Sequence, residues 1–173
     1  TRLVGSEMCI RDRFYPDRRE KSAYTIDYAD LYRKGYRGVI FDIDNTLVPH
    51  GAPATKEAAA FFASLRETGF STCLLSNNQK PRVAPFADAV GSIYIENAHK
   101  PSVKNYQEAC RRMGIKEEQA VFVGDQLFTD VYGAKRTGLY NILTEPINPK
   151  EEIQIVLKRY LEHIVLFLSL IHI

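Results

Sequence analysis

Short apolar runs of strand length alternate with amphipathic segments of helix length along most of the chain, and this alternation constrains the fold more than any other feature. Strands are expected at 38–48, 71–78, 92–95, 120–125 and 139–144, and helices at 27–34, 55–68, 81–90, 102–113, 127–137 and from Glu151 onward. Such an alternation folds as a parallel sheet with helices on both faces. The expected fold class is therefore α/β, with a Rossmann-like parallel sheet.

The composition agrees with one ordinary globular domain. A chain of 173 residues can bury a core without the help of disulfides or a structural metal. Apolar residues make up 45% of the chain and charged residues 25%, close to the averages of globular proteins. Basic residues number 23 against 21 acidic residues, a net charge of +2, so we expect no nucleic-acid partner.

The cysteines indicate a reducing compartment. Cys9, Cys73 and Cys110 are odd in number and widely spaced, which argues against a disulfide framework and a zinc site. No apolar run reaches the ~18–20 residues that span a bilayer. A cytoplasmic location is therefore expected.

Both ends of the chain differ in character from the rest. Residues 1–13 (TRLVGSEMCIRDR) have no helical or strand periodicity and lack the apolar core of a signal peptide. These residues and the closing 168–173 resemble translated sequencing adapters. We expect both segments to be non-native, with 14–167 as a single domain; naturally disordered tails are the alternative.

Polar side chains stand where the predicted strands end. In an open parallel sheet the ligand crevice lies at the carboxyl ends of the strands, so these side chains are expected to meet. Asp42 and Asp44 end one strand, Ser76 and Asn77 end another, Asp125 ends a third, and Lys100 lies in a loop on the same rim.

The residue types suit phosphoryl chemistry. Asp42, Asp44 and Asp125 offer oxygen ligands for a hard cation, Mg²⁺ above all, and the absence of Cys and His among them disfavours zinc. Because side chains alternate along a strand, Asp42 and Asp44 share a face, so one could attack an electrophile while the other moves protons. The remaining groups supply hydroxyls, an amide and a positive charge, as a dianionic phosphoryl transition state requires: Thr46, Ser76, Asn77 and Lys100.

Each motif alone also has an ordinary structural explanation. A DxD pair is often a solvated loop start, SNN is commonly a turn, and a Lys-Pro pair before a helix often only opens the helix. The GDQLFTD segment could place acids at a favourable helix N-terminus. Their joint occurrence, in chain order and at successive strand ends, favours a site.

Four segments resemble, in order, the signature motifs of the haloacid dehalogenase-like phosphatases: FDIDNTLV, LLSNN, HKP and VFVGDQLFTD. The resemblance covers roughly residues 37–144 and, within the superfamily, looks like the capless type IIIA subgroup, related to phosphatidylglycerophosphate phosphatases. It implies Mg²⁺-dependent hydrolysis of a phosphate monoester through an aspartyl-phosphate.

The resemblance also implies catalytic and metal-binding roles. Asp42 would be the nucleophile, Asp44 the proton donor and then the base, and Thr46 would help to orient this pair. Mg²⁺ would be held by Asp42, Asp125 and the main-chain carbonyl of Asp44, with Asp130 supporting the ligands from behind.

It further implies a phosphate site. Ser76 and the Asn77 amide would hold phosphate oxygens, and Lys100 would neutralise the nucleophile and the phosphate. Only 29 residues separate Thr46 from Ser76, and 23 separate Ser76 from Lys100. Each gap holds one helix and little more, so no cap domain is expected. An uncovered site suits a bulky substrate, such as a lipid headgroup or a macromolecular phosphate, or a site completed by another subunit.

Two other functions use similar residues. A phospho-accepting receiver also carries an acidic cluster and a Lys on a parallel sheet, but it needs no acid at the position of Asp44. A non-catalytic phosphate-binding module on the same scaffold would be favoured by the loss of a motif residue, and none is lost. A phosphate-ester substrate is therefore expected, and no pattern indicates an oligomeric state.

The last helix has two interpretations. Its apolar residues Ile153, Leu157, Leu161 and Ile164 form one stripe, with Lys158 and Arg159 away from the centre of that stripe. Such a helix can lie in a membrane interface, which would suit a lipid phosphate approached from the cytoplasmic side. The same stripe would also serve to pack the helix against the sheet.

Overall fold

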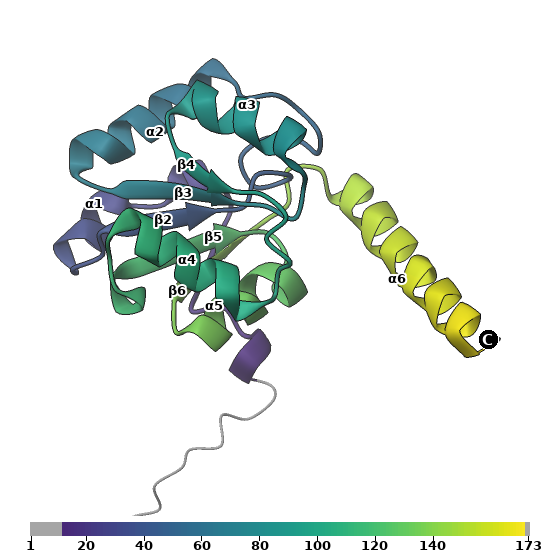
Figure 1. The fold of residues 1–173 in the computed structure, drawn as a ribbon. Coiled ribbons are helices and arrows are strands. Elements are labelled where there is room, and N and C mark those ends of the chain that lie inside the picture. The colour runs from purple at the N-terminus through teal and green to yellow at the C-terminus, as the bar shows by residue number, and fades with distance from the viewer. Residues whose placement is uncertain (1–11, 172–173) are drawn as a thin grey trace, which may run out of the picture.

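A computed structural model of the chain describes residues 12–171, apart from the side chains of Asp12 and of ten residues between positions 151 and 170. The expectations for residues 1–11 and 172–173, Cys9 included, lie outside this part. Strands and helices alternate through the described residues (Figure 1). The strands are β1 (Arg18–Glu20), β2 (Gly38–Phe41), β3 (Ser71–Leu75), β4 (Ile93–Ile95), β5 (Ala120–Gly124) and β6 (Tyr140–Thr144). The α-helices are α1 (Tyr28–Arg33), α2 (Lys56–Thr68), α3 (Lys80–Val90), α4 (Val103–Met113), α5 (Tyr132–Thr137) and α6 (Pro149–Ile171).

The strands form one six-stranded sheet in the order β1-β6-β5-β2-β3-β4. Every neighbouring pair is parallel. The chain runs outward from β2 through β3 to β4, and then crosses to the other side of β2 to form β5. This reversal puts the topological switch point of the sheet between β2 and β5, where the ligand crevice of such folds lies. The Rossmann-like α/β fold expected from the sequence is confirmed.

Helices cover both faces of the sheet, because the buried strands are apolar on both sides. In β2, Val39 and Phe41 belong to one core cluster, and Ile40 between them belongs to the other. The first cluster includes Phe62 of α2, and the second includes Tyr106 of α4. Figure 1 shows α1, α2 and α3 on one side of the sheet and α4 and α5 on the other.

Helix α2 illustrates how local signals set the element bounds. The Thr55 side chain accepts a hydrogen bond from the Ala58 N–H at 3.0 Å and so caps the first turn. Gly69 ends the helix with a φ of 111°, a left-handed conformation that glycine adopts without steric cost. The expected helix 55–68 is therefore observed within one residue.

Three expectations about local structure need correction. The strand expected at 38–48 ends at Phe41, because the chain then turns around the carbonyl of Ile43, which accepts N–H groups from the three residues 46–48. Residues 127–131 form a π-helical turn before α5, where one regular helix was expected. Strand β1 was not expected; its three residues pair with β6 at the sheet edge.

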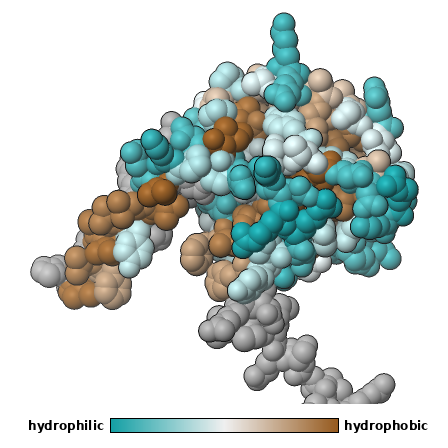
Figure 2. All heavy atoms as spheres, turned by 180° about the vertical axis from the view of Figure 1, so that it is seen from behind, coloured by the Kyte–Doolittle hydropathy of each residue, from teal (hydrophilic) through white to brown (hydrophobic). Residues whose placement is uncertain are grey.

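Helix α6 extends away from the sheet instead of covering it (Figure 1). All four residues of its predicted stripe, Ile153, Leu157, Leu161 and Ile164, are exposed. Figure 2 shows the resulting hydrophobic face along much of the helix. The packing of this stripe against the sheet, one of the two interpretations above, is therefore not observed. The side chains of Lys158 and Arg159 lie outside the described part of the chain. Within residues 12–171, no helix combines the length and hydropathy that a membrane crossing requires.

Candidate active site

The predicted site residues meet at the carboxyl edge of the sheet. Asp42, Ser76 and Asp125 each follow directly on the last residue of a strand, in β2, β3 and β5. Lys100 reaches the same place from the loop between β4 and α4. These residues, together with Thr46 and Asp130, are buried although they are polar or charged. Buried charges are costly unless they are paired, so their gathering at one edge requires compensating contacts.

Lys100 provides the central contacts. Its Nζ donates hydrogen bonds to Asp42 Oδ1 and to Asp130 Oδ1, both at 2.8 Å. Burial by itself would lower the pKa of Lys100, but the charges of Asp130 and Asp42 outweigh it and raise the pKa above its usual value. Lys100 is therefore a fixed positive charge between two carboxylates.

Asp130 is fully committed to protein partners. Its Oδ1 accepts from Lys100, and its Oδ2 accepts the Gln126 N–H at 3.2 Å. Gly124 makes this close approach feasible, because a Cβ at position 124 would collide with the Asp130 carboxylate. Asp130 thus supports Lys100 and the turn after β5.

An all-oxygen cluster stands beside Lys100. Carboxylate oxygens of Asp42, Asp125 and Asp130 lie within 4.8 Å of one another, and Thr46 Oγ1 donates to Asp125 Oδ1 at 3.0 Å. A hard cation such as Mg²⁺ prefers this donor set. Because both oxygens of Asp130 have protein donors, Asp42 and Asp125 are the carboxylates suited to hold it.

The Asp44 carboxylate belongs to a separate group of contacts. Its Oδ1 accepts from Arg82 Nη2 at 2.8 Å and from the Gly51 N–H at 2.9 Å, and its Oδ2 accepts from Asn78 Nδ2 at 2.6 Å. Burial would raise the pKa of Asp44, but the hydrogen bonds from Arg82 and Gly51 outweigh it and lower the pKa below its usual value. His50 Nδ1 lies 4.0 Å from the same carboxylate. Asp44 is therefore held ionised and oriented, apart from the acidic cluster.

The chain turns sharply between Asp44 and Thr46. Asn45 has a φ of 61°, in the left-handed region that Asn tolerates better than most residues. Its carbonyl accepts the Ile147 N–H at 3.0 Å, which ties the turn to the segment after β6. This turn directs Asp44 toward Arg82 and Thr46 toward Asp125, so the two side chains serve different groups.

Ser76 and Asn77 join the loops after β3 and β4. Ser76 Oγ accepts from the Asn78 N–H at 3.1 Å. Asn77 Oδ1 accepts the Lys100 N–H at 2.7 Å, which fixes the Lys100 backbone against β3. A small cavity of about 80 Å³ lies among these loops. Its lining contains most of the predicted site residues, Asp42, Asp44, Ser76, Asn77 and Lys100, together with Asn45, His50, Asn78, Gln126 and Thr129.

Sequence reasoning missed several residues of this site. Arg82 and Asn78 hold Asp44, and Gln126 and Thr129 line the cavity. Asn78 was within reach, since it completes the SNN segment. The sequence did not indicate a role for Arg82, because an arginine in the first turn of a surface helix is common without any function.

The geometry supports one kind of chemistry. A buried carboxylate paired with a buried Lys faces a small polar cavity, with an ionised carboxylate on another wall and oxygen ligands for a cation nearby. These groups could bind a compact oxyanion, attack it and move a proton to or from it.

Comparisons with known proteins agree with this geometry. The haloacid dehalogenase-like hydrolase family matches residues 51–138. "Probable phosphatase YqeG" of Bacillus subtilis (strain 168) is 37% identical over 139 residues, which cover 80% of this chain and 81% of that protein. "Phosphatidylglycerophosphate phosphatase 1, chloroplastic/mitochondrial" of Arabidopsis thaliana is 29% identical over 163 residues, 87% of this chain but 47% of that protein.

A solved structure shares the fold. The crystal structure of an uncharacterized protein from Corynebacterium glutamicum superposes with a TM-score of 0.54 at 23% identity, over 70% of this chain and 93% of that one. At this identity the likeness concerns the fold alone.

Proposed function

The chain belongs to the haloacid dehalogenase-like hydrolases, and on that basis we propose that it is a Mg²⁺-dependent phosphomonoesterase that works through an aspartyl-phosphate on Asp42. The observation that carries the proposal is the double contact of Lys100. Its Nζ holds Asp42 Oδ1 at 2.8 Å, which orients the carboxylate and offers positive charge where a phosphoryl group would be attacked.

The first half of the reaction transfers the phosphoryl group to the protein. A carboxylate oxygen of Asp42 attacks phosphorus, and the bond from phosphorus to the ester oxygen breaks. Asp44, ionised in the free protein, takes up a proton from solvent as the substrate binds and gives that proton to the departing alcohol. The dianionic phosphoryl group raises the pKa of Asp44 as it arrives, because like charges disfavour ionisation, and this opposes the lowering by Arg82.

The second half releases phosphate. Asp44, again ionised and held by Arg82 and Asn78, takes a proton from water, whose oxygen attacks phosphorus while the bond to Asp42 breaks. Asp42, Asp125 and the main-chain carbonyl of Asp44 would hold Mg²⁺, which supplies positive charge to the phosphoryl oxygens. Ser76 and Asn77, which line the cavity, would hold those oxygens by hydrogen bonds.

We further propose that the substrate is a lipid phosphate, met at the cytoplasmic face of a membrane. The relative from Arabidopsis thaliana bears the name of a phosphatidylglycerophosphate phosphatase, and the exposed stripe of α6 would suit a peripheral contact. Cys73 and Cys110 are free and buried, which supports a reducing compartment. Binding to anionic liposomes tests the membrane contact, and absence of binding would contradict it.

The central test is hydrolysis of a panel of phosphate esters with and without Mg²⁺. The panel contains phosphatidylglycerophosphate, nucleotides and sugar phosphates. Asp42→Asn should abolish turnover and leave the fold intact, because the uncatalysed reaction is extremely slow. Asp88→Asn, at an exposed position of α3, is the matched control and should keep full activity. Near-normal turnover by Asp42→Asn would show that Asp42 is not the nucleophile.

A further inference from the structure

A second, larger cavity adjoins the candidate active site. Its volume is about 930 Å³, at the upper end of the range for small-molecule sites. It lies between the turn after β5, the end of β6 and helix α6. Six apolar or aromatic side chains line it: Leu127, Phe128, Leu143, Pro146, Val156 and Tyr160.

The two cavities are continuous in their lining. Gln126 and Thr129 line both, and Asp125 of the acidic cluster lines the larger one. The two cavities therefore lie side by side, and a molecule with its phosphoryl group at Asp42 would enter the apolar cavity by passing Gln126 and Thr129. The part of the substrate that leaves with the ester oxygen would then occupy the larger cavity.

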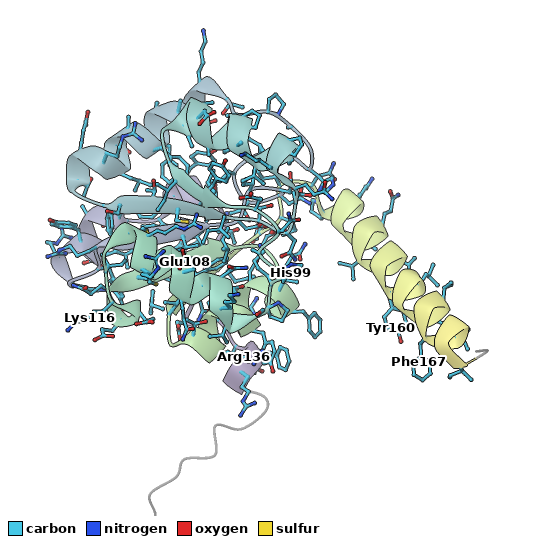
Figure 3. The ribbon with its side chains drawn as sticks, in the orientation of Figure 1. His99, Glu108, Lys116, Arg136, Tyr160 and Phe167 are labelled. Atoms are coloured by element: carbon cyan, nitrogen blue, oxygen red, sulfur yellow. The ribbon has the colours of Figure 1, made fainter. Side chains whose placement is uncertain are left out.

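Helix α6 supplies an apolar wall whose described side chains are exposed. Val156 is 51% exposed and Tyr160 is 65% exposed. Figure 3 shows Tyr160 and Phe167 on the same side of this helix. Large apolar side chains around a concave surface are characteristic of a ligand site.

Charge does not select the occupant. Arg19 and Lys21 contribute two positive charges to the lining, and Glu20, Asp125 and Glu145 contribute three negative ones. Asp125 belongs to the acidic cluster that would hold Mg²⁺, and the other four charges balance, so they favour neither an anionic nor a cationic chain. The apolar side chains therefore decide what binds.

We propose that this cavity, which we call the α6 groove, binds an alkyl chain of the phosphate ester that is hydrolysed at Asp42. The proposal rests on the proposed phosphatase function and adds to it a site for the leaving alcohol. Each methylene that leaves water strengthens binding by about fourfold when it is fully buried. An open groove covers part of each methylene, so about twofold is expected.

The test uses monoalkyl phosphates that stay monomeric in solution, so that no membrane or micelle is involved. With Mg²⁺ present, kcat/KM should rise from ethyl through butyl and hexyl to octyl phosphate, by about 60-fold over the six added methylenes. In parallel, calorimetry should detect octylphosphonate binding more tightly than ethylphosphonate. A flat series in both measurements overturns the groove but leaves the phosphatase proposal standing. Hydrolysis of no ester at all contradicts both.

Two matched variants on α6 test whether the dependence of kcat/KM on chain length arises in the α6 groove. Val156 lines the groove, whereas Val165, 63% exposed on the same helix, does not. Val156→Asp should reduce the octyl-to-ethyl ratio of kcat/KM by about tenfold or more, and Val165→Asp should leave that ratio unchanged. An equal ratio in both variants and the unmodified protein overturns the proposal. A flat series together with a dimer that Val156→Asp dissociates would instead identify a second copy of the chain as the occupant.

Discussion

Replacing Lys100 by Met isolates the electrostatic balance of the candidate active site. The Lys100 side chain is 4% exposed and contacts Asp42 and Asp130 at 2.8 Å each. With an effective dielectric constant of about 20, each contact is worth about 6 kcal/mol before desolvation is counted. Met has a similar length but no charge, so both contacts are lost while most of the packing is kept.

The variant also leaves two carboxylates facing each other. Oxygens of Asp42 and Asp130 lie within 4.8 Å, a separation at which two negative charges repel by about 3.5 kcal/mol at the same dielectric constant. Breaking a buried pair from one side typically costs about 3–5 kcal/mol after desolvation is included. We therefore expect Lys100→Met to lower the free energy of unfolding by about 3–5 kcal/mol at pH 7.

The cost should depend on pH with a definite sign. Burial raises the pKa of Asp130 to about 6, with Lys100 opposing the rise. Without Lys100 this pKa rises further. A carboxyl whose folded pKa is raised costs stability above that pKa and none when it is protonated in both states. The loss of stability caused by Lys100→Met should therefore shrink as the pH falls toward about 6, the pKa of Asp130 in the unmodified protein, and level off at lower pH.

The assay is urea unfolding in EDTA, repeated with saturating Mg²⁺. Mg²⁺ should reduce the difference in the free energy of unfolding between Lys100→Met and the unmodified protein. The reason is that a bound cation replaces part of the lost charge and stabilises the state that binds it. Lys104→Met, at an exposed position of α4, is the control and should change stability by less than about 0.5 kcal/mol. A loss below about 1 kcal/mol for Lys100→Met, or a gap that does not vary with pH, would refute the electrostatic reasoning.

Three further predictions concern the metal, the second carboxylate and the thiols. EDTA should abolish phosphatase activity and Mg²⁺ should restore it, with Ca²⁺ a poor substitute because it takes more ligands at longer distances; full activity in metal-depleted buffer would contradict this. Arg82→Met should lower kcat by about tenfold or more, since it loosens the general acid–base group, and should shift the pH–rate profile upward, because Arg82 lowers the pKa of Asp44; an unshifted profile would indicate a merely structural Arg82. Burial raises the pKa of Cys73 and of Cys110 to about 12. In a variant with Cys9 replaced by Ser, the native protein should therefore react with a thiol reagent far more slowly than the urea-unfolded protein. Prompt reaction of the native protein would contradict the burial of the two thiols.

The central fold and much of the candidate site could be predicted because they depend on local patterns. A buried parallel strand is apolar on both faces, and its last residue lies at the edge where ligands bind. Asp42, Ser76 and Asp125 follow from these two facts, and the structure brings them to one edge. Strand β1 escaped prediction because its three residues, RRE, carry no apolar pattern; its strand conformation depends on pairing with β6.

The partners of each site residue depended on tertiary contacts. Period-two alternation placed Asp42 and Asp44 on one face, yet the turn at Asn45 directs Asp44 to Arg82, 38 residues further along the chain. Lys100 was expected near Asp42, but its second contact with Asp130 required the π-helical turn after β5. Contacts of this kind depend on loop conformation, which hydrophobic periodicity does not encode.

Helix α6 also separates what the sequence determines from what tertiary contacts determine. The spacing of its apolar residues determined that a helix would form and which face would be hydrophobic. Periodicity identifies a face but not what that face meets, because the sheet, a membrane and a ligand all satisfy the same pattern. Only the tertiary structure decided that α6 leaves the sheet and that Val156 and Tyr160 instead line a cavity that shares Gln126 and Thr129 with the cavity of the candidate active site. The direction of the chain after β6 decides where that face points, and it is set by contacts such as the Ile147 N–H to the Asn45 carbonyl, between residues about a hundred positions apart.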